Sequence, residues 1–320
     1  MLSTVRQLIA TKGPLNEPTA DALAASLQAG TQAFWLDIED PDESDYTLLE
    51  RTFGFHHLTL EDIRHQNQRP KLEEYEGYVF AVMFAADWDG ADLRIREHHL
   101  YITRLYLVSV HLEPSAELAQ LRERLRATPE LTKRTPGFLF YLVVDKLVDS
   151  LFVVLDRIDD ETDVLQDQIL ERPTNDILSK ISSLKRAVVN LRKVLGAQRD
   201  LFQRLTSSNL GEPETAIYFR DVHDHIVRQY ETVDSLRDIL TGAMDIYLTT
   251  VSQRLNDVMR RLTVIATLFM PLSFITGFFG MNFGWLVARI TEPGAFALGI
   301  SLMLATIAMQ FLYFRRRGWV

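Results

Sequence analysis

Two long stretches without a charged side chain lie close together at the C-terminal end of the chain. They cover Leu262–Ala288 and Gly294–Phe314. An apolar run of roughly 20 residues is long enough to cross a lipid bilayer as an α-helix. The pattern therefore predicts two membrane-spanning helices, at about residues 260–280 and 294–314, joined by a short loop.

The middle of the chain has helical hydrophobic spacing that is interrupted at prolines. Leu139–Leu170 and Ile177–Leu205 are predicted to form two antiparallel helices. No proline lies between Pro213 and Pro271, so Glu214–Phe279 is predicted to be one continuous helix. At a rise of 1.5 Å per residue, that helix would be on the order of 100 Å long. Because a single chain has no core of that length, the pattern favours a bundle.

Two stripes with a period of seven residues follow this long helix. The acidic stripe is Asp224, Glu231, Asp238 and Asp245, and the apolar stripe is Ile226, Val233, Leu240 and Tyr247. A repeating apolar stripe is typical of helices packed in a bundle. The acidic stripe has two interpretations: a solvated face of the bundle, or carboxylates that symmetric copies bring together as ligands for divalent cations.

The first 130 or so residues mix short helical patterns with strand patterns. A helix is expected over Thr19–Ala29, and Phe34–Ile38 and Tyr78–Ala85 have the composition of strands. A hairpin-like pair follows, with strands expected in Leu93–Ile95 and in His98–Val110. This part of the chain therefore has an α/β pattern.

Together these patterns predict an α+β membrane protein with three parts. Residues 1–136 would form an α/β cytoplasmic domain, and residues 137–259 a helical cytoplasmic region that contains the long stalk helix. Residues 260–320 would form the transmembrane domain. Such a chain carries a large soluble body on a small membrane anchor.

The charge of the chain is distributed unevenly. Its net charge is -9, although residues 260–320 hold six Arg and one Glu, so the remaining residues carry -14. A strongly acidic soluble part attracts cations and argues against nucleic acid as a partner. The absence of cysteine excludes disulfides and thiolate metal sites and suits a reducing cytoplasm. The sequence has no nucleophile–base motif and no phosphate-binding loop, so we do not expect an enzyme.

Basic residues flank the two apolar runs on their outer sides. Arg260 and Arg261 precede the first run and residues 315–317 are all Arg, whereas the short segment between the runs has Arg289 and Glu292. Basic flanks stay on the cytoplasmic side of a membrane. Both termini are therefore predicted to be cytoplasmic, and the polar N-terminal segment is unlike a cleavable signal peptide.

The tripeptide Gly280-Met281-Asn282 interrupts the apolar sequence where the first predicted span ends. Irregular backbone near membrane depth is tolerated where it lines a cavity, so this position suggests the mouth of a pore. Glycine at 280 lets the backbone leave the helix, and the carbonyl groups and the Asn282 amide offer oxygens to a hydrated Mg²⁺. Two helices per subunit cannot enclose an aqueous path, so a channel requires an oligomer.

The histidines give little support for a metal site. The adjacent pairs His56–His57 and His98–His99 are expected to point their side chains apart, and His223 and His225 are expected on different faces of a helix. We interpret them as ordinary surface or packing histidines.

Several segments carry a resemblance to the CorA family of bacterial magnesium channels over essentially the whole chain. They are residues 57–62 (HLTLED), 68–75 (QRPKLEEY), 255–259 (LNDVM), 262–272 (LTVIATLFMPL), 280–283 (GMNF) and the basic tail 315–319 (RRRGW). The chain departs from the family pattern at Phe279, where tyrosine is common, and in the loop after the motif, where Glu292 is the only carboxylate.

The resemblance implies a homopentamer in the cell (inner) membrane that carries magnesium, and also cobalt or nickel, through a pore gated by cytoplasmic divalent ions. Gly280, Met281 and Asn282 would form the selective ion-binding ring. The implied pore and gate residues are Asn256, Met259, Leu262, Met270, Ser273 and Gly277. Asp221 matches a regulatory metal position, and Asp245 lies nearer the membrane on the same helix. A zinc transporter of the same fold and a membrane-anchored sensor or scaffold remain as alternatives.

Overall fold

The computed structural model describes residues 5–10, 13–16, 33–90, 92–132, 135–207, 215–281, 284, 287 and 293–319. The chain divides into two compact units, Met1–Met244 and Asp245–Val320. The finer division into three domains at residues 136 and 259 stays a prediction.

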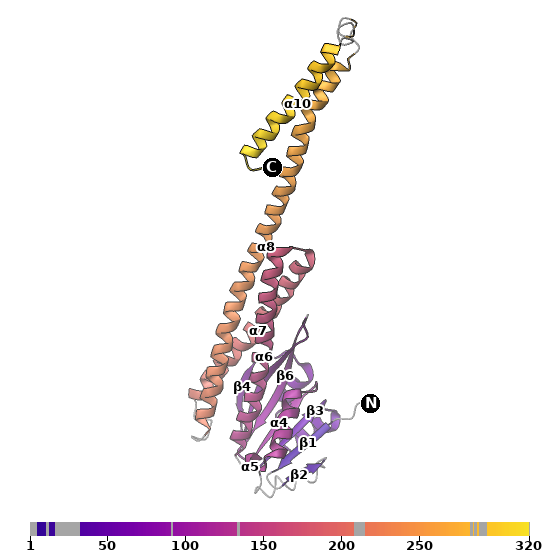
Figure 1. Ribbon diagram of the computed structural model, residues 1–320. Helices are drawn as coiled ribbons and strands as arrows, with labels where there is room; N and C mark the ends of the chain where they lie inside the picture. The colour runs from indigo at the N-terminus through magenta and orange to yellow at the C-terminus, as the bar shows by residue number, and fades with distance from the viewer. Residues whose placement is uncertain are drawn as a thin grey trace. The chain divides into compact units, whose positions relative to one another are not determined.

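The first unit is built on a seven-stranded sheet with helices on it (Figure 1). Its strand order is β2 (Gly13–Asn16), β1 (Val5–Ala10), β3 (Phe34–Glu39), β7 (Tyr106–His111), β6 (Leu93–Ile102), β5 (Tyr78–Trp88) and β4 (Lys71–Tyr75). Neighbouring strands are antiparallel except β3 and β7, which are parallel. The sheet confirms the α/β pattern of the N-terminal part.

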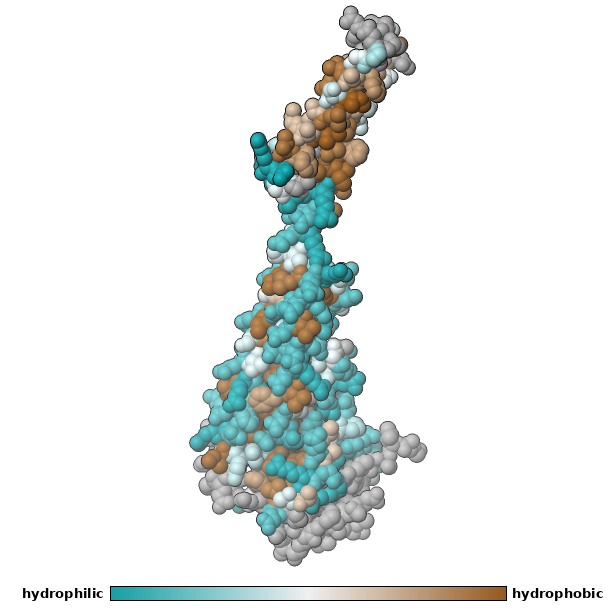
Figure 2. Space-filling view, viewed as in Figure 1, coloured by the Kyte–Doolittle hydropathy of each residue, from teal (hydrophilic) through white to brown (hydrophobic). Residues whose placement is uncertain are grey.

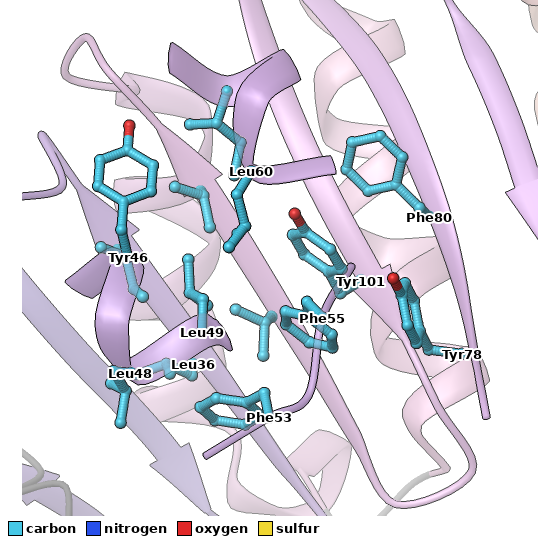
Figure 3. Close-up of a cluster of buried hydrophobic side chains, with 14 of the residues drawn as sticks. Leu36, Tyr46, Leu48, Leu49, Phe53, Phe55, Leu60, Tyr78, Phe80 and Tyr101 are labelled. Carbon is cyan, nitrogen blue, oxygen red and sulfur yellow. The ribbon is translucent and has the colours of Figure 1, made fainter. Parts of the chain in front are cut away.

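An aromatic core lies between one face of this sheet and the helices α2 (Glu43–Arg51) and α3 (His57–His65). Asp42 begins α2 with a capping box, because its side chain accepts hydrogen bonds from the first turn while Asp45 bonds back to its backbone. Figure 3 shows the rings of this core, where Phe55 stacks on Tyr101 with 3.9 Å between ring centroids.

The other face of the sheet packs against α4 (Ala116–Ala127) and α6 (Pro136–Glu171), and α5 (Pro129–Thr132) is a short turn between them. Asp37 is buried on this face, where it accepts hydrogen bonds from Ser109 and Arg122. Burial alone would raise the pKa of Asp37, but its hydrogen bond with His111 and the Arg122 charge outweigh burial and lower it.

The three predicted long helices are confirmed. They are α6, α7 (Asn175–Ser207) and α8 (Ala216–Phe279), and α8 alone has 64 residues. The apolar stripe of α8 is buried at Ile226, Val233, Leu240 and Tyr247, whereas the acidic stripe is exposed. The seven-residue pattern therefore marked the packed face of the helix correctly.

One strand prediction is wrong. The break expected between Ile95 and His98 does not exist, because β6 runs through Arg96 and Glu97 without interruption. Arg96 is paired with Glu117 at 2.9 Å, and one oxygen of the Glu97 carboxylate accepts hydrogen bonds from two backbone N–H groups, so both polar side chains have partners within the fold. The helix expected over Thr19–Ala29 lies outside the described residues.

The second unit contains the end of α8 and α10 (Pro293–Arg316). Both helices are long and apolar enough to cross a membrane. Figure 2 shows apolar side chains covering the C-terminal part of α8 and most of α10, where a soluble protein would carry polar ones. The helix bounds agree with the two spans predicted at about 260–280 and 294–314.

Candidate ion pathway and cation site

Helix α8 ends directly before the predicted ion-binding tripeptide. The last helical residue is Phe279, and the Gly280 and Met281 amides still donate to the carbonyls of Thr276 and Phe278 at 2.9 and 3.3 Å. A Cβ atom on Gly280 would lie 3.2 Å from the Thr276 carbonyl oxygen, which is closer than side chains normally approach. Glycine is therefore favoured by this close contact with the last helical turn. Asn282 lies outside the described residues.

The six predicted pore residues occupy one face of α8. At about 100° per residue, Asn256, Met259, Leu262, Met270, Ser273 and Gly277 fall within an arc of roughly 120°. All six are exposed in the single chain. Met259, Leu262 and Met270 expose 57%, 62% and 73% of their surface. An exposed apolar face of this kind marks a surface that meets lipid or another subunit.

The opposite face of α8 is the one that α10 covers. Between residues 262 and 279, the partly covered positions are Val264, Leu268, Pro271, Leu272, Ile275 and Phe279. They span an arc of about 100° whose centre lies about 190° from that of the predicted pore face. Phe279 packs against Gly299 of α10, and Gln310 of α10 donates a hydrogen bond to the Thr267 carbonyl. Figure 1 shows α10 alongside this part of α8. With α10 on one side, the other side of α8 is free to face a pore.

A cluster of carboxylates and a histidine lies where α6 meets α8 in the first unit. Ligand atoms of Asp145, Asp149 and His225 all lie within 4.8 Å of one another, and the three side chains are half-buried. Asp221 extends the cluster, because its Oδ1 lies 3.9 Å from His225 Nε2. Among the residues that the structure describes, this is the one group of three potential ligands close enough to hold a metal ion.

The electrostatics of the cluster favour a bound cation. Burial first, and the neighbouring Asp149 carboxylate second, raise the pKa of Asp145 to about 6. Burial likewise raises the pKa of Tyr141 to about 12, with added repulsion from Asp145 and Asp221. His225 Nδ1 is buried without a hydrogen-bond partner among the residues that the structure describes. A divalent cation would neutralise the carboxylates, and the oxygen donors suit Mg²⁺ while the imidazole suits Co²⁺, Ni²⁺ or Zn²⁺.

The two predicted regulatory residues, Asp221 and Asp245, differ in their distance from this cluster. Asp221 lies beside the cluster, whereas Asp245 is exposed and is not one of its ligands. A regulatory role of either residue stays a prediction. The sequence did not predict that Asp145, Asp149 and His225 lie together in this cluster. Asp145 and Asp149 on α6, like Asp221 and His225 on α8, lie four residues apart and therefore on one face of their helix. Which face of α6 meets which face of α8 depends on tertiary packing, so the sequence does not reveal the cluster.

Of the two adjacent histidine pairs, the prediction that the side chains point apart is correct for His98–His99 and wrong for His56–His57. His98 lies near His111 and His99 near Phe80, with ring centroids 5.3 and 6.0 Å apart, so these two side chains do point apart. His56 and His57 instead lie together, with 4.3 Å between their ring centroids. His56 caps α3 by accepting a hydrogen bond from the Leu58 amide, which turns its ring toward the next residue.

The chain combines an α/β unit with a long helix that continues into an apolar span and with a second apolar helix after a short polar motif. This architecture is that of a membrane transport protein with a large soluble domain. Residues 30–316 match the CorA-like Mg²⁺ transporter protein family. The chain therefore belongs to this family, whose members are transporters and not enzymes. The recognised resemblance is confirmed.

Individual relatives agree with this assignment. The chain is 38% identical to the cobalt/magnesium transport protein CorA of Thermotoga maritima over 84% of this chain and 78% of that protein. It is 33% identical to the putative metal ion transporter YfjQ of Bacillus subtilis, with 89% of each chain covered. The complete CorA magnesium transporter from Methanocaldococcus jannaschii has the same fold, with a TM-score of 0.84, 24% identity and 100% of each chain covered.

Proposed function

We propose that this chain is one subunit of a homopentameric channel in the cell membrane that takes up Mg²⁺. The observation that carries the proposal is the placement of all six predicted pore residues opposite α10. Five copies of α8, arranged with this face inward and α10 outward, would line a path with Asn256 and Ser273 as polar positions and Leu262 and Met270 as apolar ones. Both termini would then be cytoplasmic.

In this proposal the tripeptide at the end of α8 selects the ion. Mg²⁺ dehydrates reluctantly, so a site can bind it with its water shell through carbonyl and amide oxygens. Gly280 and Met281 would supply carbonyls and Asn282 its side-chain amide oxygen. Further along the path, rings of Met259, Leu262 and Met270 would exclude water when the channel is closed.

The cluster at Asp145, Asp149, Asp221 and His225 is proposed to sense cytoplasmic divalent cations. Each soluble part carries -14, so five copies repel one another until cations neutralise carboxylates between them. High internal Mg²⁺ would close the channel by this route and low Mg²⁺ would release it. Co²⁺ and Ni²⁺ are further transported ions in this proposal. Transport of Zn²⁺ is the alternative within the same fold.

The proposal is tested by cation flux into proteoliposomes that contain the purified full-length protein. We expect Mg²⁺ uptake that Asn282→Ala abolishes, while the pentamer measured by light scattering stays intact. Asn190→Ala, which removes an exposed amide on α7, is the matched control and should transport normally. Uptake that survives Asn282→Ala would remove the tripeptide from the mechanism. No flux of Mg²⁺, Co²⁺, Ni²⁺ or Zn²⁺ would favour a membrane-anchored sensor or scaffold.

A further inference from the structure

Helix α8 contains a proline within its apolar part. Pro271 has no N–H group, so it cannot donate to the carbonyl four residues earlier. That carbonyl belongs to Thr267. In a helix surrounded by lipid or protein, a carbonyl freed in this way needs another donor, because no bulk water reaches it.

A side chain of the second apolar helix supplies the donor. Gln310 of α10 donates from Nε2 to the Thr267 carbonyl oxygen over 2.9 Å. The orientation of the amide is fixed by chemistry, since a carbonyl only accepts hydrogen bonds and the nitrogen must therefore face it. Gln310 Oε1 is buried and has no hydrogen-bond partner in the described part of the chain, so the Thr267 contact alone orients the amide.

Gln310 is unusual among the polar residues of α10. It is the only amide and there is no charged residue between Gly294 and Phe314. The hydroxyls of Ser301 and Thr306 donate to carbonyls of their own helix, to Ala297 and Leu302 at 2.8 Å each. Gln310 instead reaches across to α8 at the carbonyl that lacks its normal donor. A general preference for polar contacts between helices does not explain that choice of acceptor.

The bond lies at a mechanically distinct point of α8. A proline frees one backbone hydrogen bond and lets a helix bend there. The turn from Thr267 to Pro271 follows Leu262 and contains Met270, so the weakened turn carries one of the apolar residues proposed to gate the pore. Any bending of this turn changes the distance from the Thr267 carbonyl to α10.

We infer that Gln310 is a positioning residue, whose side chain replaces the backbone hydrogen bond lost at Pro271 and ties α10 to the hinge of α8. Its effect on gating rests on the proposed function, whereas the bond itself does not. With the tie in place, bending of α8 at Pro271 must either move α10 along with it or break the bond. Gln310 thereby holds the turn that carries Met270 in the conformation of this structure.

The test is a cycle of two substitutions in the full-length protein. Gln310→Met removes the amide and keeps the length of the side chain, and Pro271→Ala returns a backbone donor to the Thr267 carbonyl. Thr306→Val is the matched control, because it removes a hydrogen bond within α10 and none to α8. Two quantities are measured: the melting temperature of the detergent-solubilised protein, and the internal Mg²⁺ concentration that halves flux in proteoliposomes.

We expect Gln310→Met alone to lower the melting temperature and to shift the half-inhibitory Mg²⁺ concentration about threefold, the factor that corresponds to an average hydrogen bond between membrane helices. In the Pro271→Ala background both effects should fall to less than half, because Thr267 then has its own donor. Thr306→Val should cause neither effect. If Gln310→Met prevents assembly, Pro271→Ala should restore it.

Equal effects of Gln310→Met in both backgrounds would overturn the inference, since Gln310 would then contribute packing and not a replacement bond. Failure of Pro271→Ala to rescue an unassembled Gln310→Met protein would overturn it as well. The melting temperature does not depend on transport. Coupling of the two substitutions without any cation flux would support the bond and refute the channel, whereas normal flux without coupling would refute the bond alone.

Discussion

Replacement of Asp145 by asparagine tests the cation cluster most directly. The carboxyl of Asp145 is half-buried beside Asp149, and burial first and this neighbour second raise its pKa from 3.8 to about 6. Without a cation, the folded protein therefore holds an ionised Asp145 at a cost. Asparagine keeps the size and shape of the side chain and removes that cost.

The magnitude follows from the two pKa values. The difference between 3.8 and about 6, at about 1.4 kcal/mol for each pH unit, is roughly 3 kcal/mol, an upper value because the carboxyl is only half-buried. A raised pKa means that the folded state binds the proton more tightly than the unfolded chain. The contribution of Asp145 to stability is therefore fully present below pH 3.8 and is lost as the pH rises through about 6.

The assay is thermal unfolding of the full-length protein at pH 5 and pH 8, with EDTA and with saturating Mg²⁺. At pH 8 in EDTA, Asp145→Asn should be more stable than wild type by up to about 6 °C, at about 2 °C per kcal/mol for a chain of this size. The difference should shrink at pH 5, where the wild-type carboxyl is largely protonated. Saturating Mg²⁺ should stabilise wild type more than the variant, because a bound cation removes the same repulsion.

The control is Asp167→Asn, which removes an exposed carboxylate from the same helix. It should change the melting temperature little at either pH and leave the gain with Mg²⁺ intact. If Asp145→Asn equals wild type at pH 8 in EDTA and gains as much from Mg²⁺, the carboxylates at the meeting of α6 and α8 do not bind a cation.

Two further predictions concern α8. Leu262→Gly should wet the proposed constriction and raise Mg²⁺ leak at high internal Mg²⁺, whereas an assembled pentamer with unchanged leak would show that Leu262 faces lipid. Gly242→Ala should stabilise the protein by about 1 kcal/mol, because glycine weakens a helix interior by about that amount. A Cβ atom at this position would have no atom within 4 Å in the described part of the chain. A lower melting temperature of Gly242→Ala would instead indicate that a neighbouring subunit packs against this glycine.

The helices and the two apolar spans could be predicted because each carries its signal locally. An apolar stripe repeated over many turns, as at Ile226 and Val233, is explained almost only by a packed helix. A charge-free run of about 20 residues has even fewer explanations besides a membrane span. β6 was split wrongly for the opposite reason. The partners that make Arg96 and Glu97 acceptable inside a strand lie far away in the sequence, so the local pattern indicated a loop.

The candidate sites divide in the same way. Gly280 and the predicted pore face follow from positions along one helix, so the sequence and the family resemblance were enough to propose them. The cation cluster depends on which face of α6 meets α8, and the Gln310 bond depends on which carbonyl of α8 lies beside α10. Pro271 predicts a freed carbonyl at Thr267 from the sequence alone. The sequence does not predict which side chain bonds to that carbonyl.

The continuity of α8 connects these sites. Asp221 and His225 lie near its N-terminal end and Leu262 and Met270 toward its C-terminal end, on one helix of 64 residues. A helix transmits displacement along its axis as long as its backbone hydrogen bonds are intact. Gly242 and Pro271 are two interior positions that weaken this one, the first through backbone entropy and the second through the lost bond. Because Gln310 replaces that bond, we predict that a movement which begins at the proposed cation cluster is absorbed first near Gly242. Gly242→Ala would then strengthen the proposed control of the gate by cytoplasmic cations.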